Sequence, residues 1–290
     1  MNFEKKPSKL RYLRFFRNYP VLPAAILLVL TVLAATATFT APHHPVMGDL
    51  RSRHQPPFWM PDGTTEHLLG TDQQGRDILS RIMHGARVSL VFATATMTTG
   101  VILGIFFGTI SGYFGGHVDE LIMRLVDLSN ALPFILAALV VVSLFGASFL
   151  TLLLVISLFS WGGFARQIRG EVLRLRQMDY VALAKVSGAS PVRIIWKHLV
   201  PGIVNTTIVV ATLGTGQVIL AESTLSFLGV GIPPPNPAWG SMVSDGRNFI
   251  ASSWWIAVIP GLAIAFTVLS LNFLGDWLRD RLDPRLRQVQ

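Results

Sequence analysis

Two short polar motifs in this sequence contain residue types that could bind a ligand. Gly70-Thr71-Asp72 and Gly75-Arg76-Asp77 repeat a glycine–polar–aspartate pattern, which could cradle a phosphate or hold a metal ion. A phosphate-binding P-loop would place a lysine directly after its last glycine, and Arg76 occupies that position here. We therefore expect these six residues to form a structural element of an external loop.

Histidines are the other candidate ligands in the same region. His43, His44 and His54 lie close together in the sequence, but no helix that carries carboxylates orders them. Histidines in such a loop usually bind no metal, so we predict no metal site. The chain contains no cysteine, which excludes disulfides, Cys-ligated zinc and iron–sulfur clusters.

No enzyme motif accompanies these residues. The sequence has no Walker A motif, no H-E-x-x-H zinc motif and no G-x-S-x-G nucleophile motif. We therefore expect a protein that is not an enzyme and that needs no cofactor of its own. If the chain works as a pump, another subunit must supply the energy.

Glu222 is an ionisable residue directly after the apolar run 218–221. Such a residue is costly in a membrane unless it is paired or hydrated. Two interpretations remain open. Glu222 could belong to a transport pathway or gate together with Ser223, Ser226 and Gly214, or it could be a solvated helix end or an ion pair between subunits.

The elements that must position these residues are membrane helices. The chain is 51% hydrophobic and only 14% charged, with a mean hydropathy of +0.52. A soluble domain usually carries about 25% charged residues. The net charge of +8 could favour binding to nucleic acid, but it is also typical of the cytoplasmic loops of membrane proteins. We expect an all-α, polytopic membrane protein that binds the lipid bilayer and no nucleic acid.

Six apolar stretches are long enough to cross a bilayer: residues 20–41, 88–113, 128–145, 148–165, 203–220 and 254–275. The first is too long for the apolar core of a signal peptide, so we interpret it as a retained anchor. Pro133, Pro260, Gly214 and Gly216 lie within these stretches. They could permit gate movements or simply allow close packing.

The distribution of lysine and arginine predicts the orientation. Basic residues are concentrated in the N-terminal tail, in the segment between the fourth and fifth stretches, and in the C-terminal tail. With six spans these three regions lie on one side, which the positive-inside rule identifies as the cytoplasm. Both termini are therefore predicted to be cytoplasmic, and the long loop before residue 87 lies outside.

Residues 179–202 form a polar interruption, DYVALAKVSGASPVRIIWKHLVPG, on the cytoplasmic side. The pattern predicts a short helix over 179–186, a turn at Gly188, and a second helix that Ser190 caps and Pro191 begins. Residues 192, 195, 196 and 199 would form one apolar stripe, and Pro201-Gly202 would end the helix. This helix pair could dock on another protein or lie on lipid headgroups.

This segment resembles the "EAA" coupling loop of ABC importer permeases. Residues 182–188, ALAKVSG, and 198–201, HLVP, place glycine and proline as that motif does, although Ala182 replaces its leading glutamate. Residues 67–90, 221–247 and 272–287 also resemble segments of one permease branch, DppC/OppC, from importers of dipeptides, oligopeptides and nickel. The resemblance spans nearly the whole chain after its N-terminal region.

The resemblance implies a type I ABC importer permease fold in a bacterial inner membrane. The implied organisation is a cytoplasmic tail with the first helix (1–45), an extracytoplasmic loop (46–85), a transmembrane core (86–276) and a cytoplasmic tail (277–290). The implied partners are a homologous DppB/OppB-like permease, two DppD/DppF-like ATPases that bind ATP and magnesium, and an extracytoplasmic substrate-binding protein. The motifs at residues 70–77 would face that binding protein.

The implied function is to form half of a pathway for peptides and to couple it to ATP hydrolysis. Nickel or another small cargo is the alternative, and a membrane enzyme or a stand-alone channel is a further one. The residues expected to couple transport to the ATPases are Asp179, Ala182, Ala184, Lys185, Gly188, Ala189, Ser190, Pro191, Arg193 and Pro201. Below, residues 179–202 are called the coupling loop.

Overall fold

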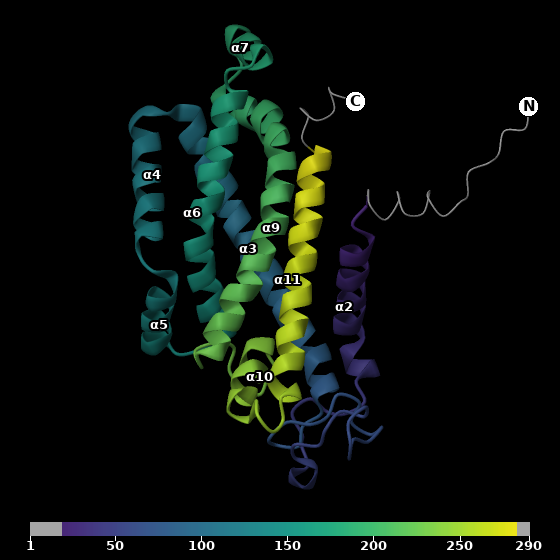
Figure 1. Ribbon diagram of the computed structural model, residues 1–290. Coiled ribbons are helices and arrows are strands. Elements are labelled where there is room, and N and C mark those ends of the chain that lie inside the picture. The colour runs from purple at the N-terminus through teal and green to yellow at the C-terminus, as the bar shows by residue number, and fades with distance from the viewer. Residues whose placement is uncertain (1–18, 283–290) are drawn as a thin grey trace, which may run out of the picture.

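The computed structural model describes residues 19–282 and shows a bundle of long helices (Figure 1). Within that range the only extended pairing is an isolated bridge between Thr71 and Asp77. The predicted tails at 1–18 and 283–290 lie outside the described residues. The α-helices are α2 (Val21–Thr40), α3 (Ile78–Phe114), α4 (Gly116–Ala131), α5 (Phe134–Phe145), α6 (Phe149–Leu175), α7 (Asp179–Val186), α8 (Pro191–Ile194), α9 (Val200–Phe227), α10 (Trp239–Gly246) and α11 (Trp255–Leu282).

Most of the predicted spans correspond to single helices. Among residues 19–282, five helices are long and apolar enough to cross a membrane, and the pair α4 and α5 makes a sixth span if it is counted as one. Two helices extend well past the predicted limits. The side chain of Asp77 caps α3 by accepting the Ser80 N–H, so this helix begins inside the predicted external loop 46–85. At the other end, α11 continues to Leu282, into the predicted tail.

The third predicted span, residues 128–145, is not one straight helix. It is divided between α4 and α5, which meet at an angle of 83°. Leu132 has an extended backbone because the ring of Pro133 disfavours a helical conformation in the residue before it. The hydropathy pattern continues across this break and therefore could not indicate it.

A stripe of glycines brings α3 against α6. Gly100, Gly104, Gly108 and Gly112 recur at every fourth position and are all buried. A Cβ atom on Gly104 would lie only 2.3 Å from the Cβ of Phe164. Small residues at this spacing let two membrane helices approach closely and gain van der Waals contact along their length. This close contact forms the centre of the bundle.

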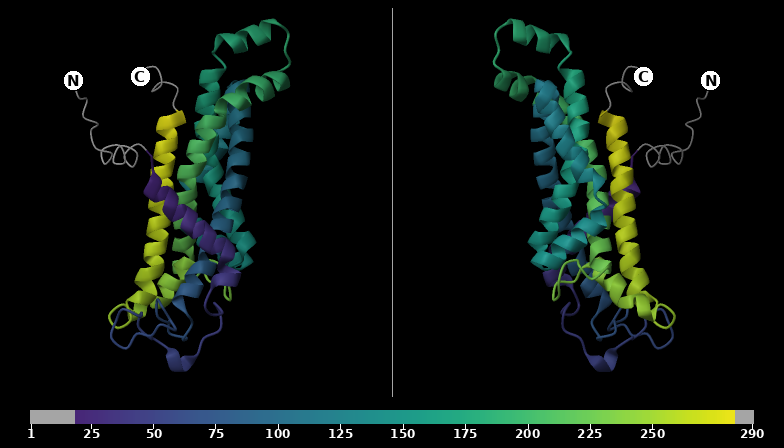
Figure 2. Two further views of the ribbon diagram at one scale, coloured as in Figure 1. Left: turned by 90° about the vertical axis from the view of Figure 1, so that its right-hand side faces the viewer. Right: turned by 90° about the vertical axis from the view of Figure 1, so that its left-hand side faces the viewer.

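The two ends of the bundle differ (Figures 1 and 2). One end carries α7, and the C-terminal end of α11 lies on the same side. The loop of residues 41–77 and helix α10 lie at the opposite end. Helix α2 crosses the outside of the bundle obliquely and packs on α3 and α11. Its first residues lie near the end of α11, where the rings of Tyr19 and Trp277 are 6.2 Å apart.

Candidate functional site

Helix α7 projects beyond the bundle, and the sequence of the coupling loop explains its local shape (Figure 1). The helix spans Asp179–Val186 as predicted. Gly188 then turns the chain with φ of +78°, which glycine adopts without a steric penalty. The hydroxyl of Ser190 accepts the Arg193 N–H at 3.4 Å, and Pro191 begins α8. The predicted turn and N-cap are therefore confirmed.

The apolar side chains of the coupling loop divide into two sets. Val181, Ile194 and Leu199 are buried and pack against residues of α6, including Ile168 and Val172. This contact fixes the loop to the bundle. A second set of apolar side chains in the coupling loop is not part of this contact.

The second set is an exposed apolar surface on the coupling loop. It consists of Leu183, Val186, Val192 and Trp196, and Val186 is 88% exposed and Trp196 68% exposed. The predicted single stripe through residues 192, 195, 196 and 199 is therefore wrong. Ile194 faces the core instead of Val192 because the helix is fixed by its contact with α6. Exposed apolar surface of this kind marks an interaction site.

The junction with α9 also differs from the prediction. Residues Ile195–Leu199 form a π-helical turn, in which the Val200 N–H donates to the Ile195 carbonyl. The chain then continues as α9 through Pro201 and Gly202, so Pro201-Gly202 does not end the helix. A π-helical turn changes the hydrogen-bond register, and this change accommodates a proline near the start of the next helix.

Two contacts connect the coupling loop region to α3. The ammonium of Lys185 lies 5.5 Å from the ring centre of Tyr113. The guanidinium of Arg176, between α6 and α7, donates to the carbonyls of Gly112 and Tyr113 at 3.0 and 3.1 Å. These carbonyls are left unpaired at the end of α3, and Arg176 satisfies them. A displacement of α7 would therefore act on both α3 and α6.

All ten residues expected to couple the loop to the ATPases lie on this projection or at its junction with α9. Ala184 and Ala189 are half-buried. Within residues 19–282, neither Asp179 nor Arg193 forms an ion pair. The exposed members are Asp179, Ala182, Lys185, Gly188, Ser190, Pro191, Arg193 and Pro201.

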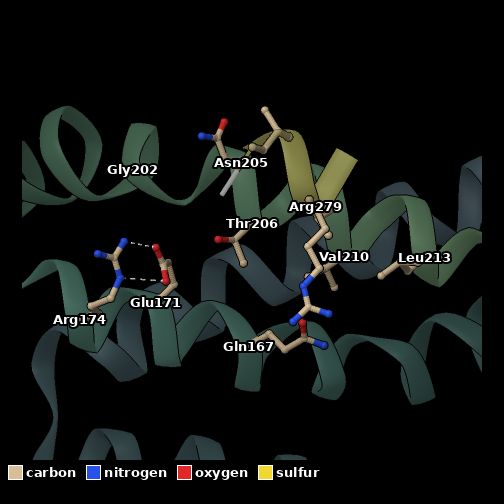
Figure 3. Close-up of a pocket in the computed structure, with 11 residues that line it drawn as sticks. Gln167, Glu171, Arg174, Gly202, Asn205, Thr206, Val210, Leu213 and Arg279 are labelled. Atoms are coloured by element: carbon tan, nitrogen blue, oxygen red, sulfur yellow. Dashed lines mark hydrogen bonds and ion pairs between the residues drawn. The ribbon is translucent and has the colours of Figure 1, made fainter. Parts of the chain in front are cut away.

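A cavity of about 490 Å³ lies where the coupling loop joins the bundle (Figure 3). Helices α6, α9 and α11 line it. The guanidinium of Arg174 pairs with Glu171 at 2.5 Å, and Arg279 extends from α11 toward Gln167. The cavity therefore combines charged groups from helices that belong to different parts of the sequence.

A second cavity, of about 500 Å³, lies between α3, α4, α5, α6 and α9. Gly214 is part of its wall, as are Leu132 and Phe134, which flank the break at Pro133. Polar side chains that line it are Ser129, Asn130, Ser160 and Gln217. An apolar cavity with a few polar groups has the composition of a small-molecule site. Sequence reasoning missed Asn130 and Gln217 because polar residues in apolar stretches show no pattern of their own.

Glu222 lies away from this cavity. It is 1% exposed, so the interpretation as a solvated helix end is wrong. Its carboxylate accepts a hydrogen bond from the Ser226 hydroxyl at 2.6 Å, and the Ser223 hydroxyl is 3.5 Å away. The structure therefore groups Glu222 with both predicted serines but separates all three from Gly214.

The motifs at residues 70–77 form a buried network at the opposite end of the bundle. The carboxylate of Asp72 accepts hydrogen bonds from Arg76 and from Arg81 of α3. Arg76 also contacts Asp245 of α10 at 3.3 Å. The carbonyl of Thr71 accepts the indole N–H of Trp255 at 3.2 Å. These contacts connect the 41–77 loop to α3, α10 and α11.

A cluster beside this network contains residues that the sequence did not bring together. His43 and His67 stack with ring centres 4.5 Å apart, and Glu66 lies next to them. His44 and His54 are not part of the cluster. Sequence reasoning grouped the histidines by their order in the chain and therefore missed His67.

Comparisons with known proteins agree with this architecture. Residues 100–288 match the family model described as binding-protein-dependent transport system inner membrane component. The chain is 36% identical over 284 residues to a di/tripeptide transport system permease protein, DppC, of Pseudomonas aeruginosa, covering 98% of this chain and 94% of that protein. It is 38% identical over 264 residues to the dipeptide permease DppC of Bacillus subtilis, covering 91% of this chain and 81% of that protein.

Among solved structures, the fold is similar to a chain of the MetNI methionine ABC transporter in inward-facing conformations. The TM-score is 0.57 with 14% identity, and the match covers 70% of this chain and 96% of that chain. Identity this low supports a shared fold and nothing more specific.

Proposed function

Since the chain belongs to the family of binding-protein-dependent transport system inner membrane components, we propose that it forms half of a peptide pathway driven by ATP. A homologous permease of the DppB/OppB type would supply the other half. Two ATPases would bind ATP and magnesium, and a substrate-binding protein would deliver the cargo. The chain itself would neither hydrolyse ATP nor carry a cofactor.

The observation that supports this function best is the shape of the coupling loop. Its buried residues are fixed to α6, while Leu183, Val186, Val192 and Trp196 remain exposed on the projection. A stand-alone channel or enzyme needs no exposed apolar projection, because it has no partner to dock on. We infer that this surface docks on an ATPase, and that movement of the ATPase reaches α3 and α6 through the contacts at their ends.

The same contacts favour docking over an attachment to lipid headgroups. An amphipathic helix on a membrane surface would turn its apolar side toward the bilayer. Here the side nearest the bundle is already occupied by contacts with α6. Helix α7, which carries the exposed Leu183 and Val186, extends beyond the ends of the long helices (Figure 2). Its natural partner is therefore a protein beyond the membrane.

The cargo pathway is best supported at the second cavity, which α4, α5, α6 and α9 line together with Met97 of α3. The bend at Pro133 contributes Leu132 and Phe134 to its wall, and Asn130 and Gln217 supply groups that can bond to a peptide backbone. We propose di- or oligopeptides as the cargo because the relatives with full-length similarity are peptide permeases. Glu222, buried with its serines outside this cavity, would act on the pathway only indirectly.

A cysteine crosslink tests the docking. The chain has no native cysteine, so Ala189→Cys introduces a single thiol at the tip of the coupling loop. In the assembled transporter, this thiol should crosslink to an ATPase subunit that carries a cysteine on the surface proposed to contact the coupling loop. Ser252→Cys, exposed at the opposite end of the bundle, is the matched control and should not react. Absence of a crosslink at residue 189 in an active complex would reject the proposed docking.

A further inference from the structure

Three potential metal ligands lie close together in the loop between the end of α2 and the start of α3. One ligand atom from each of His43, Glu66 and His67 lies within 4.8 Å of the others. His43 comes from the segment after α2, whereas Glu66 and His67 precede α3 by about ten residues. The folded loop brings these groups together, although more than twenty residues separate them in the sequence.

A buried carboxylate orients one of these histidines. Asp77 is 1% exposed, and its Oδ1 lies 3.0 Å from Nδ1 of His67. Because a carboxylate only accepts hydrogen bonds, Nδ1 must carry the proton, and Nε2 of His67 is left with its lone pair free. A carboxylate–histidine pair of this kind typically fixes the ring of a metal-ligating histidine and increases its basicity.

The same carboxylate also holds His43 in place. Its Oδ2 accepts both the N–H and the hydroxyl of Ser80, at 2.8 and 2.7 Å. The Ser80 hydroxyl oxygen in turn accepts the backbone N–H of His43 at 3.0 Å. Both histidines are therefore positioned by hydrogen bonds that begin at Asp77, and the cluster does not depend on flexible side chains alone.

The Nδ1 atom of His43 provides a second observation that points to a ligand. This atom is buried but has no hydrogen-bond partner among the described residues, and its nearest opposite charge, Oδ1 of Asp77, is 3.9 Å away. A buried polar atom without a partner is costly, and native structures usually satisfy such atoms with water or an ion. A cation held by the two imidazoles and the carboxylate of Glu66 would relieve this deficit.

We propose that His43, Glu66 and His67 form a binding site for a divalent transition-metal ion such as Zn²⁺. Two imidazoles and one carboxylate suit zinc, cobalt and nickel better than magnesium or calcium, which prefer oxygen ligands. Three protein ligands leave one position for water. The ion would join the end of α2 to the loop before α3, and so attach the outermost helix to the bundle. Such a site would differ from the expectation of no bound metal, and its ion would be independent of the cargo.

Equilibrium dialysis of Zn²⁺ against the purified full chain in detergent tests the site. The affinity tag must contain no histidine, and the protein is first stripped of metal with a chelator. The chain should bind one ion, and Co²⁺ in its place should give the visible absorption of a four-coordinate site. Glu66→Gln, at an exposed position that packing does not restrict, should weaken binding at least about 10-fold, as is common when a metal site loses a supporting group.

His44→Gln is the matched control. His44 is adjacent to His43, but its Nδ1 accepts the N–H groups of Val46 and Met47 at 3.3 Å. This variant should bind Zn²⁺ like the unaltered chain. Thermal unfolding gives a second readout, because a fixed concentration of Zn²⁺ should raise the unfolding temperature of the unaltered chain and of His44→Gln more than that of Glu66→Gln. Equal affinity of Glu66→Gln and the unaltered chain, or no binding to either, would overturn the proposal.

Discussion

Replacing Gly188 by proline should uncouple ATP hydrolysis from transport. Gly188 has φ of +78°, whereas the proline ring holds φ near −65°. Proline would also remove the hydrogen bond from the Gly188 N–H to the Lys185 carbonyl, which is 3.0 Å long. Ser187, with ψ of 6°, has a conformation that a following proline disfavours. Three separate features of the turn therefore oppose this substitution.

These effects can be summed from the structure. The left-handed conformation costs an ordinary L-residue about 1–2 kcal/mol, proline costs more because its ring excludes this φ, and the lost hydrogen bond adds about 1 kcal/mol. A penalty of about 3 kcal/mol or more would reduce the population of the native turn by about a hundredfold. No atom lies within 4 Å of a Cβ at Gly188, so the damage should stay in the turn and leave the bundle assembled. Gly188→Ala should have only the cost of the left-handed conformation, so its effect on coupling should lie between those of the unaltered chain and Gly188→Pro.

The assay compares ATP hydrolysis with uptake of a labelled dipeptide by the complete transporter in proteoliposomes. Gly188→Pro should lower the amount of peptide transported for each ATP hydrolysed. Gly146→Pro is the matched control, because Gly146 has φ of +81° and equally open surroundings but lies at the opposite end of the bundle. Full transport per ATP by an assembled Gly188→Pro complex would refute the coupling role. Ala182→Glu should be tolerated, since Ala182 is exposed.

Gly104→Leu should lower the unfolding temperature in detergent, because its Cβ would lie 2.3 Å from Phe164 and overpacking typically costs about 1–3 kcal/mol. Gly163→Leu, in open surroundings on α6, is the control, and equal melting of the two variants would contradict the tight α3–α6 contact. Gln217→Leu should slow peptide uptake in proteoliposomes, because it removes a polar group from the cavity wall. An unchanged uptake rate would exclude Gln217 from the pathway.

Local features of the fold could be predicted because they depend on neighbouring residues. A run of apolar residues of sufficient length indicates a span, whatever lies around it. The start and end of α7, the turn at Gly188 and the cap at Ser190 follow from the backbone preferences of a few residues. The bend at Pro133 was indicated only as one of several possible kinks, since proline is also tolerated inside α11 at Pro260.

Features that depend on contacts between distant segments could not be predicted. The apolar pattern of the coupling loop predicted a stripe that includes Val192, whereas packing on α6 buries Ile194 instead. The polar Gln217 became part of a candidate site only when α3, α4, α5, α6 and α9 enclosed a cavity. The burial of Glu222 depends on how α9 packs in the bundle, so its position after an apolar run could not predict it.

Hydropathy and charge alone indicate that the chain crosses a membrane several times, and similarity to known proteins identifies its family. Hydropathy and charge reflect the free energy of transferring each residue from water to lipid. This free energy depends on the residue type and needs no knowledge of the fold. The packing of the helices, in contrast, determines which side chains come into contact. It left Trp196 exposed while Leu199 is buried, and it placed His43 beside His67. Such proximity arises from the packing of whole helices, so the sequence of a single segment cannot predict it.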